Sequence, residues 1–243
     1  MVVRASALLA LVADLAVYDA AADRLPGIGL WWNVALLGLL VIPATFALVG
    51  LALPARRSRL LVPVTVALIG LAVLLEATDL EIAANFLKLA AITGAGWFFL
   101  RFFEEVSWIV LVAVLVVPID IVSVARGPTR TLIEDQPQVF DYLSVAFPIP
   151  GEASAAQLGL PDVLFYALFL GAAERFGLRV WQTWLACTLS FGATLAITVG
   201  GDVTGLPALP LLSLAFIAVN ADRLWIQLRS HVEGAGTHRL RRR

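Results

Sequence analysis

The sequence predicts an all-α fold, a polytopic bundle of about eight transmembrane helices, and two features of its composition support this. Of the 243 residues, 60% are hydrophobic and 14% are charged, and the mean hydropathy is +0.92. Soluble domains carry about 25% charged residues, so this chain has too little polar surface for that class. Several apolar runs also reach the roughly 17–25 residues that a helix needs to cross a bilayer. We therefore expect an integral membrane protein.

Eight apolar runs are the expected spans. They cover residues 5–22, 29–53, 58–77, 82–100, 104–126, 158–174, 179–200 and 205–224. The seven tryptophans lie toward the ends of these runs, as residues of an interfacial aromatic belt do. We expect residues 1–226 to form a single transmembrane domain and residues 227–243 to form a basic tail.

The first run has a second interpretation, as a signal peptide. Arg4 precedes it, and Ala20 and Ala22 are small residues near its end. Asp14, in the middle of the run, argues against cleavage. Without this run the chain would keep seven spans and the same orientation of its C-terminus.

The distribution of arginine orients the spans. Arginines follow spans two, four, six and eight, and with eight spans these segments all lie on one side of the membrane. They are Arg56, Arg57, Arg59, Arg101, Arg175, Arg179, Arg229, Arg239, Arg241, Arg242 and Arg243. The opposite short loops are acidic or neutral, so we expect both termini to be cytoplasmic. Sparse lysine and abundant arginine and alanine favour a bacterial or archaeal cell membrane.

One long connection, residues 127–157, joins spans five and six. It contains four prolines and two glycines together with several charged residues. Connections longer than about 12–15 residues are usually functional or disordered. We expect a solvated loop with some local order.

The remaining composition excludes several chemistries. The single cysteine, Cys187, rules out an internal disulfide and a cysteine-only metal cluster. The two histidines, His231 and His238, belong to the polar tail, so metal binding by histidine within the membrane is not expected. The chain has no glycine-rich phosphate loop, and its basic tail is too short to indicate nucleic acid. We expect no metal, no cofactor and no nucleic-acid partner.

An ionisable residue inside a span is costly and is by default a functional-site hypothesis. The candidates are Asp14, Lys88, Asp120 and Asp162. Lys88 lies near one end of its span, where snorkelling to the interface would explain it. Asp14 lies deeper and could make a polar contact with another helix.

Asp120 and Asp162 differ from the other candidates because their expected depths agree. Asp120 precedes Arg126 by roughly 9 Å of helix, and Asp162 lies at a similar distance after Gln157. Pro207 lies early in the last span, on the same side. Two carboxyl groups brought together there would share a proton, activate a water and protonate a leaving group. Alternatively, Asp162 could simply favour its helix dipole, and Asp120 could be a polar residue near an interface.

Prolines shape the backbone beside these acids. Pro161 lacks an N–H and disfavours the α conformation of the residue before it, so we expect Gly159 and Leu160 to be extended and the helix to begin near Asp162. The two prolines within residues 206–210 predict a non-helical or kinked segment. Non-helical backbone at membrane depth lines a cavity or is buried in protein, and it could pair with an extended substrate. A simple proline kink is the alternative.

These motifs, in this order, resemble the presenilin and signal peptide peptidase family of intramembrane aspartyl proteases. That family carries Tyr-Asp, Gly-x-Gly-Asp and Pro-Ala-Leu motifs on three helices. At the corresponding places this chain has Ile119-Asp120, Gly159-Leu160-Pro161-Asp162 and Pro207-Ala208-Leu209. Residues 127–134 and 206–210 also resemble their presenilin counterparts. The resemblance covers about residues 115–225.

The resemblance implies a presenilin-like fold and cleavage of peptide bonds within membrane-spanning protein helices. It implies that Asp120 and Asp162 are the catalytic pair. The substrate site would be shaped by Gly159, Leu160, Pro161, Leu206, Pro207, Ala208 and Leu209. The oligomeric state is left open by the sequence.

Two residues depart from the family pattern, and three other functions stay open. Ile119 replaces the tyrosine, and Pro161 replaces the second glycine. The family usually has nine spans, whereas this chain has eight apolar runs. The alternatives are a proton- or cation-coupled transporter with an aspartate pair in its path, a catalytically impaired relative that only binds membrane helices, and a prepilin-peptidase-type protease that uses Asp14.

Overall fold

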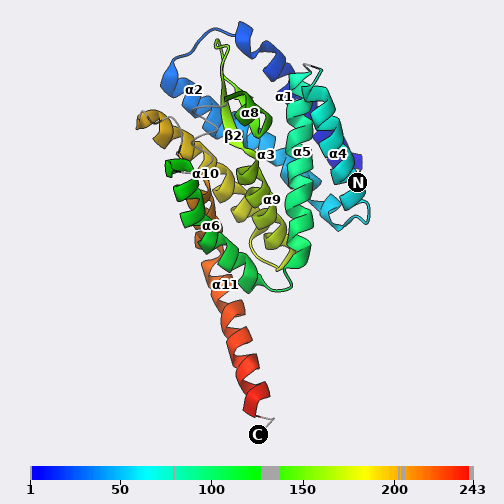
Figure 1. Ribbon diagram of the computed structural model, residues 1–243, viewed down its shortest axis with the longest axis vertical. Helices are drawn as coiled ribbons and strands as arrows, with labels where there is room; N and C mark the ends of the chain where they lie inside the picture. Colours follow the sequence, from blue (N-terminus) through cyan, green and yellow to red (C-terminus); the bar gives the residue numbers. More distant parts are fainter. Residues whose placement is uncertain (1, 79, 127–136, 202, 204–205, 241–243) are drawn as a thin grey trace.

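The computed structural model describes residues 2–78, 80–126, 137–201, 203 and 206–240, with the backbone alone for residues 2, 137–138 and 230–240. Ten helices and one hairpin make up most of this part of the chain (Figure 1). The helices are α1 Val2–Ala21, α2 Leu30–Leu36, α3 Ile42–Ala52, α4 Leu61–Glu76, α5 Glu81–Phe99, α6 Val106–Arg126, α8 Pro137–Tyr142, α9 Leu160–Arg175, α10 Val180–Gly200 and α11 Leu209–Leu240. The strands are β1 Ser144–Pro148 and β2 Ala155–Gly159. A π-helical segment, Leu37–Val41, joins α2 to α3, and short 3-10 turns extend α1, α3 and α5.

Six helical segments of the described chain are long and apolar enough to cross a membrane. They are Val3–Arg24, Leu30–Arg57, Glu81–Phe102, Val106–Arg126, Val180–Gly200 and Leu209–Arg229. Two further helices, α4 and α9, coincide with the other predicted spans but have only 16 residues each. The six long helices support an integral membrane protein. A total of eight crossings stays a prediction, because α4 and α9 are shorter than a bilayer-spanning helix usually is.

Helix α9 lies at the centre of the bundle, in contact with α5, α6, α10 and α11 (Figure 1). Its residues 166–170, 172 and 173 are at most 1% exposed. A helix that is apolar on all sides is expected to be surrounded by protein or lipid, and the sequence Tyr-Ala-Leu-Phe-Leu-Gly-Ala-Ala has no polar face. The neighbouring helices cover α9 on its apolar sides, and α9 therefore forms the core.

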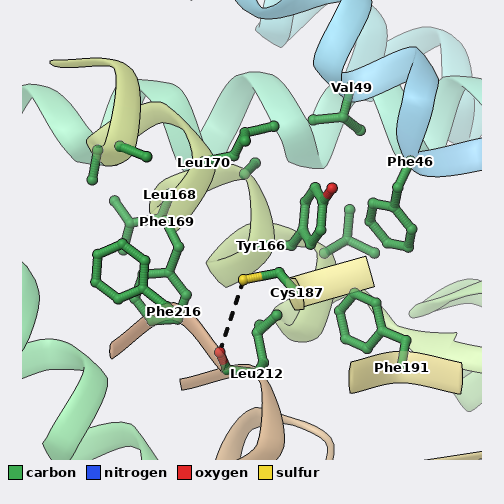
Figure 2. Close-up of a cluster of buried hydrophobic side chains, with 14 of the residues drawn as sticks. Phe46, Val49, Tyr166, Leu168, Phe169, Leu170, Cys187, Phe191, Leu212 and Phe216 are labelled. Atoms are coloured by element: carbon green, nitrogen blue, oxygen red, sulfur yellow. Dashed lines mark hydrogen bonds between the residues drawn. The ribbon is translucent and has the colours of Figure 1, made fainter. Parts of the chain in front are cut away.

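Aromatic side chains join α9 to its neighbours (Figure 2). The ring of Tyr166 lies 4.2 Å from that of Phe46 on α3 and 5.9 Å from that of Phe191 on α10, measured between centroids. The Tyr166 hydroxyl forms a 2.9 Å hydrogen bond with the Thr188 hydroxyl, so its polar atom is satisfied inside the core. These contacts fix the position of α9 along and around its axis.

Close backbone approach between α5 and α9 depends on Gly96. A Cβ atom at this position would lie 2.6 Å from the carbonyl oxygen of Leu164. Such small residues let helices approach closely in a membrane, where packing rather than the hydrophobic effect holds them together.

The arginine-rich connections meet at one end of α9. Glu174, the penultimate residue of α9, accepts hydrogen bonds from Arg56 at 2.5 Å and from Arg57 at 2.6 Å. Arg175 donates to the carbonyl oxygen of Leu100 at 2.6 Å, and Arg101 donates to that of Ser58 at 3.0 Å. The arginines that follow predicted spans two, four and six therefore lie at the same end of the bundle, as the arginine pattern requires.

The connection between α6 and α9 contains the hairpin, so the fold is not purely helical. β1 and β2 pair in antiparallel fashion, with Ser144 opposite Gly159 and Ala146 opposite Gln157. The expected local order is present, but the expected solvation is wrong for β1, because Val145 and Phe147 are 1% and 3% exposed. Alternating apolar side chains bury one face of the strand against the bundle. Residues 127–136 of the predicted loop, with the presenilin-like residues 127–134, lie outside the described residues.

Polar side chains from α1 and α5 hold the outer edge of β1. The Asn85 side chain donates to the carbonyl oxygen of Ala146 at 2.8 Å and accepts from the Ala146 N–H at 2.9 Å. Tyr18 donates to the carbonyl oxygen of Pro148 at 2.8 Å. The Asn85 amide therefore takes the place of a neighbouring strand.

Lys88, for which the sequence suggested snorkelling, has partners within the protein. Its ammonium pairs with Glu76 at 3.3 Å and donates to the Asp141 carbonyl oxygen at 3.0 Å, and its side chain is 12% exposed. Partners on α4 and beside the hairpin were close enough to satisfy the charge inside the protein. The residue is therefore a structural link between α5 and the segment that precedes β1.

Two helix starts decide the shape of the candidate site. Helix α9 begins at Leu160 rather than near Asp162, so the expectation of an extended Leu160 is wrong. The second residue of a helix needs no N–H, so Pro161 is accommodated in the first turn. Helix α11 begins at Leu209, and the backbone of residues 206–208 is non-helical as predicted. Helix α11 then continues past residue 226 to Leu240.

Candidate active site

A cavity of about 450 Å³ lies where α6, α9, α10, the hairpin and the segment before α11 meet. Most of the residues predicted for the site line it. The full lining is Ile42, Asp120, Val124, Phe140, Leu143, Phe147, Ala155, Ala156, Gln157, Leu158, Gly159, Pro161, Asp162, Phe191, Thr194, Leu195, Thr198, Leu206, Pro207 and Ala208. Apart from the two carboxyl groups, the cavity is walled by apolar side chains, two threonines and one glutamine.

Asp120 comes from the part of α6 that follows Pro118 and reaches across to the start of α11. The backbone N–H of Leu209 donates to its carboxylate Oδ2 at 3.1 Å. Leu209 is the first residue of α11, so the carboxylate lies at the positive end of that helix dipole. This bond attaches the catalytic candidate on α6 to the proline-containing segment.

Asp162 occupies the first turn of α9, directly after the hairpin. Its carboxyl group also interacts with the backbone of Gly159, the last residue of β2. A Cβ atom on Gly159 would lie 3.2 Å from Asp162 Oδ2, tighter than ordinary van der Waals contact. Glycine therefore leaves the room that this carboxyl group occupies.

The two carboxyl groups face the same space from different helices. Both line the cavity, and they are close enough to interact electrostatically. Among the hydrogen bonds of the described residues, none joins Asp120 to Asp162 directly. Two carboxyl groups that occupy one site share a proton more easily than both ionise.

The segment before α11 forms one wall of the cavity. Leu206, Pro207 and Ala208 line it, and Leu209 contributes the N–H that Asp120 accepts. Pro207 and Pro210 have no N–H, so Ala208 and Leu209 hold the only backbone donors from Pro207 to Pro210. The prolines thus leave few donors in this wall, and the helical hydrogen bonding of α11 begins with the Leu212 N–H donating to the Ala208 carbonyl oxygen at 3.1 Å.

Among the described residues, the edge of strand β2 that faces away from β1 has no backbone partner. The Ala146 N–H and C=O both bind Asn85, so they point away from β2. In an antiparallel pair, directly opposed residues point their backbone groups either toward each other or both outward. Ala146 is opposite Gln157, so the Gln157 N–H and C=O point outward from β1. All five residues of β2 line the cavity, so this edge borders it.

Three of the singled-out residues lie elsewhere. Leu160 does not line the cavity; its N–H donates to the Leu143 carbonyl oxygen at 2.9 Å and continues the pairing of the hairpin. Ile119, at the place of the family tyrosine, is 65% exposed and also lies outside the lining. Asp14 on α1 is exposed and does not contribute to this cavity.

Sequence reasoning missed the hairpin residues and the α10 face that complete the site. Ala155, Ala156, Gln157 and Leu158 belong to β2, and the Pro150-Gly151 pair was the signal that could have indicated a turn between two short strands. Gly151 has a positive φ of 74°. On α10, Thr194 and Thr198 are one helical turn apart, a spacing that places both on one face.

Neither a metal nor a reactive thiol is indicated near the carboxyl pair. Within the described residues, no group of three or more histidine, cysteine, aspartate or glutamate side chains could hold a metal ion. Cys187 is buried 3.9 Å from the Leu212 carbonyl oxygen, in the core of α9, α10 and α11 (Figure 2). Among the residues that line the cavity, the ionisable side chains are those of Asp120 and Asp162.

No family model matches this sequence, and no curated protein matches it as a relative. The site is therefore defined by the convergence of its residues in the structure. That convergence joins three short motifs that are distant in the sequence, and it is the basis for the function proposed next.

Proposed function

We propose that this chain is an intramembrane aspartyl protease of the presenilin and signal peptide peptidase type, which hydrolyses peptide bonds within membrane-spanning helices. The observation that supports this function best is the pairing of Asp120 and Asp162 in one cavity, on helices separated by a long connection. Two carboxyl groups that share one proton are the machinery of aspartyl proteases.

The proposed reaction uses the pair as one unit. An ionised carboxylate removes a proton from water, and the water oxygen attacks the scissile carbonyl carbon while the protonated carboxyl donates to the carbonyl oxygen. As the tetrahedral diol collapses, the C–N bond breaks, and the carboxyl group that took the water proton passes it to the leaving amine nitrogen. One diol hydroxyl returns its proton to the other carboxylate, which restores the pair. We assign the roles of acid and base to the pair, because coupled carboxyl groups titrate together. The Leu209 N–H keeps Asp120 oriented during these steps.

The proposed substrate is a transmembrane helix that unwinds locally. A closed helix uses its carbonyl groups in its own hydrogen bonds, so the scissile bond must be extended before attack. The cavity volume of about 450 Å³ is within the roughly 300–1,000 Å³ of ligand sites. The outward edge of β2 offers backbone groups with which an extended segment could pair by strand addition.

Substitution of Gln157 tests the strand-addition part of the proposal. Gln157→Pro would remove one outward N–H, which the pairing of β1 and β2 does not use. The matched control is Gln157→Ala, because the Gln157 side chain also binds Ser144 at 3.0 Å. We expect Gln157→Pro to lower kcat/KM about tenfold below Gln157→Ala, equivalent to about 1.4 kcal/mol. Equal kinetics for the two variants would contradict substrate pairing at this edge.

The deciding experiment measures cleavage of a model transmembrane substrate by the purified protein in liposomes. Asp120→Asn and Asp162→Asn should each reduce the rate at least about 100-fold, since each removes a proton-transfer group. Asp14→Asn is the matched control, because Asp14 lies outside the cavity and its loss should leave the rate unchanged. A transition-state-analogue inhibitor of aspartyl proteases should block the reaction. Undiminished cleavage by either cavity variant overturns the proposal.

The same experiment separates the alternatives. A transporter would carry protons or cations across the liposome membrane without cleaving the substrate. A catalytically impaired relative would bind the substrate helix without cleaving it, and restoring the family pattern with Ile119→Tyr or Pro161→Gly would then test the cause. Dependence of cleavage on Asp14 would favour a prepilin-peptidase-type enzyme.

We also propose that the protein lies in a bacterial or archaeal cell membrane with its arginine-rich end in the cytoplasm. The support is the meeting of Arg56, Arg57, Arg101 and Arg175 at one end of the bundle. A fluorescent or phosphatase reporter fused after residue 243 tests the orientation, since the first is active inside the cell and the second outside. Phosphatase activity would overturn it.

A further inference from the structure

Helix α1 carries an acidic residue at the centre of its apolar segment. The segment Val3–Arg24 is long and apolar enough to cross a membrane. Asp14 lies at its midpoint, about 16 Å of helix from either end. An acidic side chain at that depth is among the costliest groups to place in a bilayer, and in known membrane proteins it almost always faces the bundle interior or a partner.

The Asp14 side chain points outward from this bundle instead. It is exposed, whereas Leu15, the next residue of α1, is buried against the other helices. Within the described part of the chain, Asp14 has no hydrogen bond or ion pair. The neighbouring acid Asp19 on the same helix is by contrast partly buried. Apolar exposure is ordinary on a membrane protein, but an unpaired carboxyl group at mid-depth is not.

The surface around Asp14 suits close approach of another helix. Helical spacing places Ala7, Ala10 and Val17 on the same face as Asp14. All three are exposed. Small side chains on such a face allow the backbones of two membrane helices to come together, and a polar group between them can then be satisfied. We call the face formed by Ala7, Ala10, Asp14 and Val17 the α1 acidic face.

We propose that the α1 acidic face docks a membrane-spanning helix of another protein that carries a lysine or arginine at mid-depth. The carboxylate is then neutralised by an opposite charge rather than left in lipid. The face lies on α1, which contributes no residue to the cavity of Asp120 and Asp162, so the docked helix does not occupy that cavity. This inference is independent of the proposed protease activity.

A second copy of this chain fits the face less well, because its described residues offer no free cation at the right depth. Lys88 is the only lysine of the chain; its side chain is 12% exposed and its ammonium already pairs with Glu76. Arg223, which lies near the middle of α11, donates to the Gly177 carbonyl oxygen at 2.8 Å. Charge complementarity therefore favours a different protein as the occupant.

Association in liposomes tests the proposal with a defined probe. The probe is a 22-residue leucine–alanine peptide with one central lysine, labelled for energy transfer to the full-length protein, and the control peptide has leucine in place of lysine. We expect the lysine peptide to associate at least about tenfold more tightly than the leucine peptide. Asp14→Leu should remove that difference. Because Asp14 is exposed and has no hydrogen bond or ion pair with the described residues, this substitution should leave the fold intact.

Moving the carboxylate to another lipid-facing position tests whether binding requires the α1 acidic face or only a negative charge. The double variant Asp14→Leu/Leu39→Asp puts a carboxylate at another lipid-facing position, since Leu39 is 68% exposed. Recovery of tight binding by this variant would overturn the proposal, as would equal binding of both peptides to the unmodified protein. Asp14-dependent energy transfer between two copies of the protein, without peptide, would also overturn it in favour of a homodimer.

Discussion

Each end of α9 carries a partly buried acidic residue, and the two residues have opposite kinds of neighbour. At the arginine-rich end, Glu174 accepts hydrogen bonds from Arg56 and Arg57, at 2.5 and 2.6 Å. At the other end, Asp162 faces a second carboxyl group, that of Asp120, across a cavity. The acids are about 18 Å apart along one helix and belong to the same bundle.

The partners of an acidic residue indicate whether it stabilises the fold or is a candidate for function. A carboxylate with an opposite charge at hydrogen-bonding distance stabilises the fold, because its removal leaves the arginine unpaired. A carboxyl group beside another carboxyl group gains no such stabilisation and is therefore a candidate for a functional role. Substitutions at the two ends should therefore move different observables.

The largest expected effect comes from the carboxyl pair. The variant Asp120→Asn/Asp162→Asn should lose about as much activity as either single variant, at least about 100-fold, because the two groups act as one unit. Its melting temperature should be unchanged or higher, since the repulsion between carboxyl groups is gone. Thermal unfolding in detergent and cleavage assays measure the two properties. A loss in the double variant equal to the product of the single losses would argue against a dyad.

A substitution at the arginine-rich end of α9 should change the free energy of unfolding rather than the activity. Glu174→Gln removes the charge that Arg56 and Arg57 share, and we expect a loss of about 1–3 kcal/mol of unfolding free energy. Activity of the folded fraction should be close to that of the unmodified protein. Glu104→Gln is the control, because Glu104 is exposed on the loop before α6. Equal unfolding curves for the two variants would remove the contrast between the ends of α9.

A smaller change at the cavity end should affect catalysis without changing charge. In Gly159→Ala the new methyl group lies 3.2 Å from Asp162 Oδ2 and displaces the carboxyl group by a few tenths of an ångström. We expect kcat to fall about tenfold, since displacements of 1 Å can cost about 100-fold. Gly70→Ala is the control, because no other part of the protein lies within 4 Å of a Cβ atom there. Unaltered kcat in Gly159→Ala would mean that the carboxyl position is not critical.

The smallest effect is expected from the anchor of the hairpin. Asn85→Ala removes both hydrogen bonds to Ala146, which together contribute about 1–3 kcal/mol locally. Amide hydrogen exchange should accelerate in residues 144–159 and remain slow in residues 163–173 of α9. Activity should fall a few-fold through a raised KM, because β2 is held less firmly. Uniform acceleration across both segments would show that Asn85 stabilises the whole bundle instead.

Much of the molecule was predictable from short segments. The apolar runs predicted the helices, because a helix in lipid must satisfy its own backbone groups and therefore has a recognisable length and composition. The prolines at 207 and 210 predicted the non-helical segment before α11. Distances to the ends of their runs predicted similar depths for Asp120 and Asp162, and both residues line one cavity.

Other features could not be predicted from the sequence, because they depend on which face of each helix packs against which neighbour. Apolar residues surround α9 on all sides, so nothing local indicates which face meets α6. The hairpin was hidden because its strands have five residues each, and Asn85, which completes the edge of β1, is distant in sequence. Lys88 and Asp14 show the same limit: each is a charge within an apolar run, yet one points to Glu76 and the other away from the protein.

The membrane class, the approximate helices and the candidacy of Asp120 and Asp162 follow from the amino-acid sequence. That these two acids line one cavity, that the Leu209 N–H binds one of them, and that all of β2 lines the same cavity follow from the packing of the helices. The physical reason is that hydropathy and proline act along the chain, within a few residues. The rotation of each helix about its axis is set by packing against neighbours that are far away in the sequence.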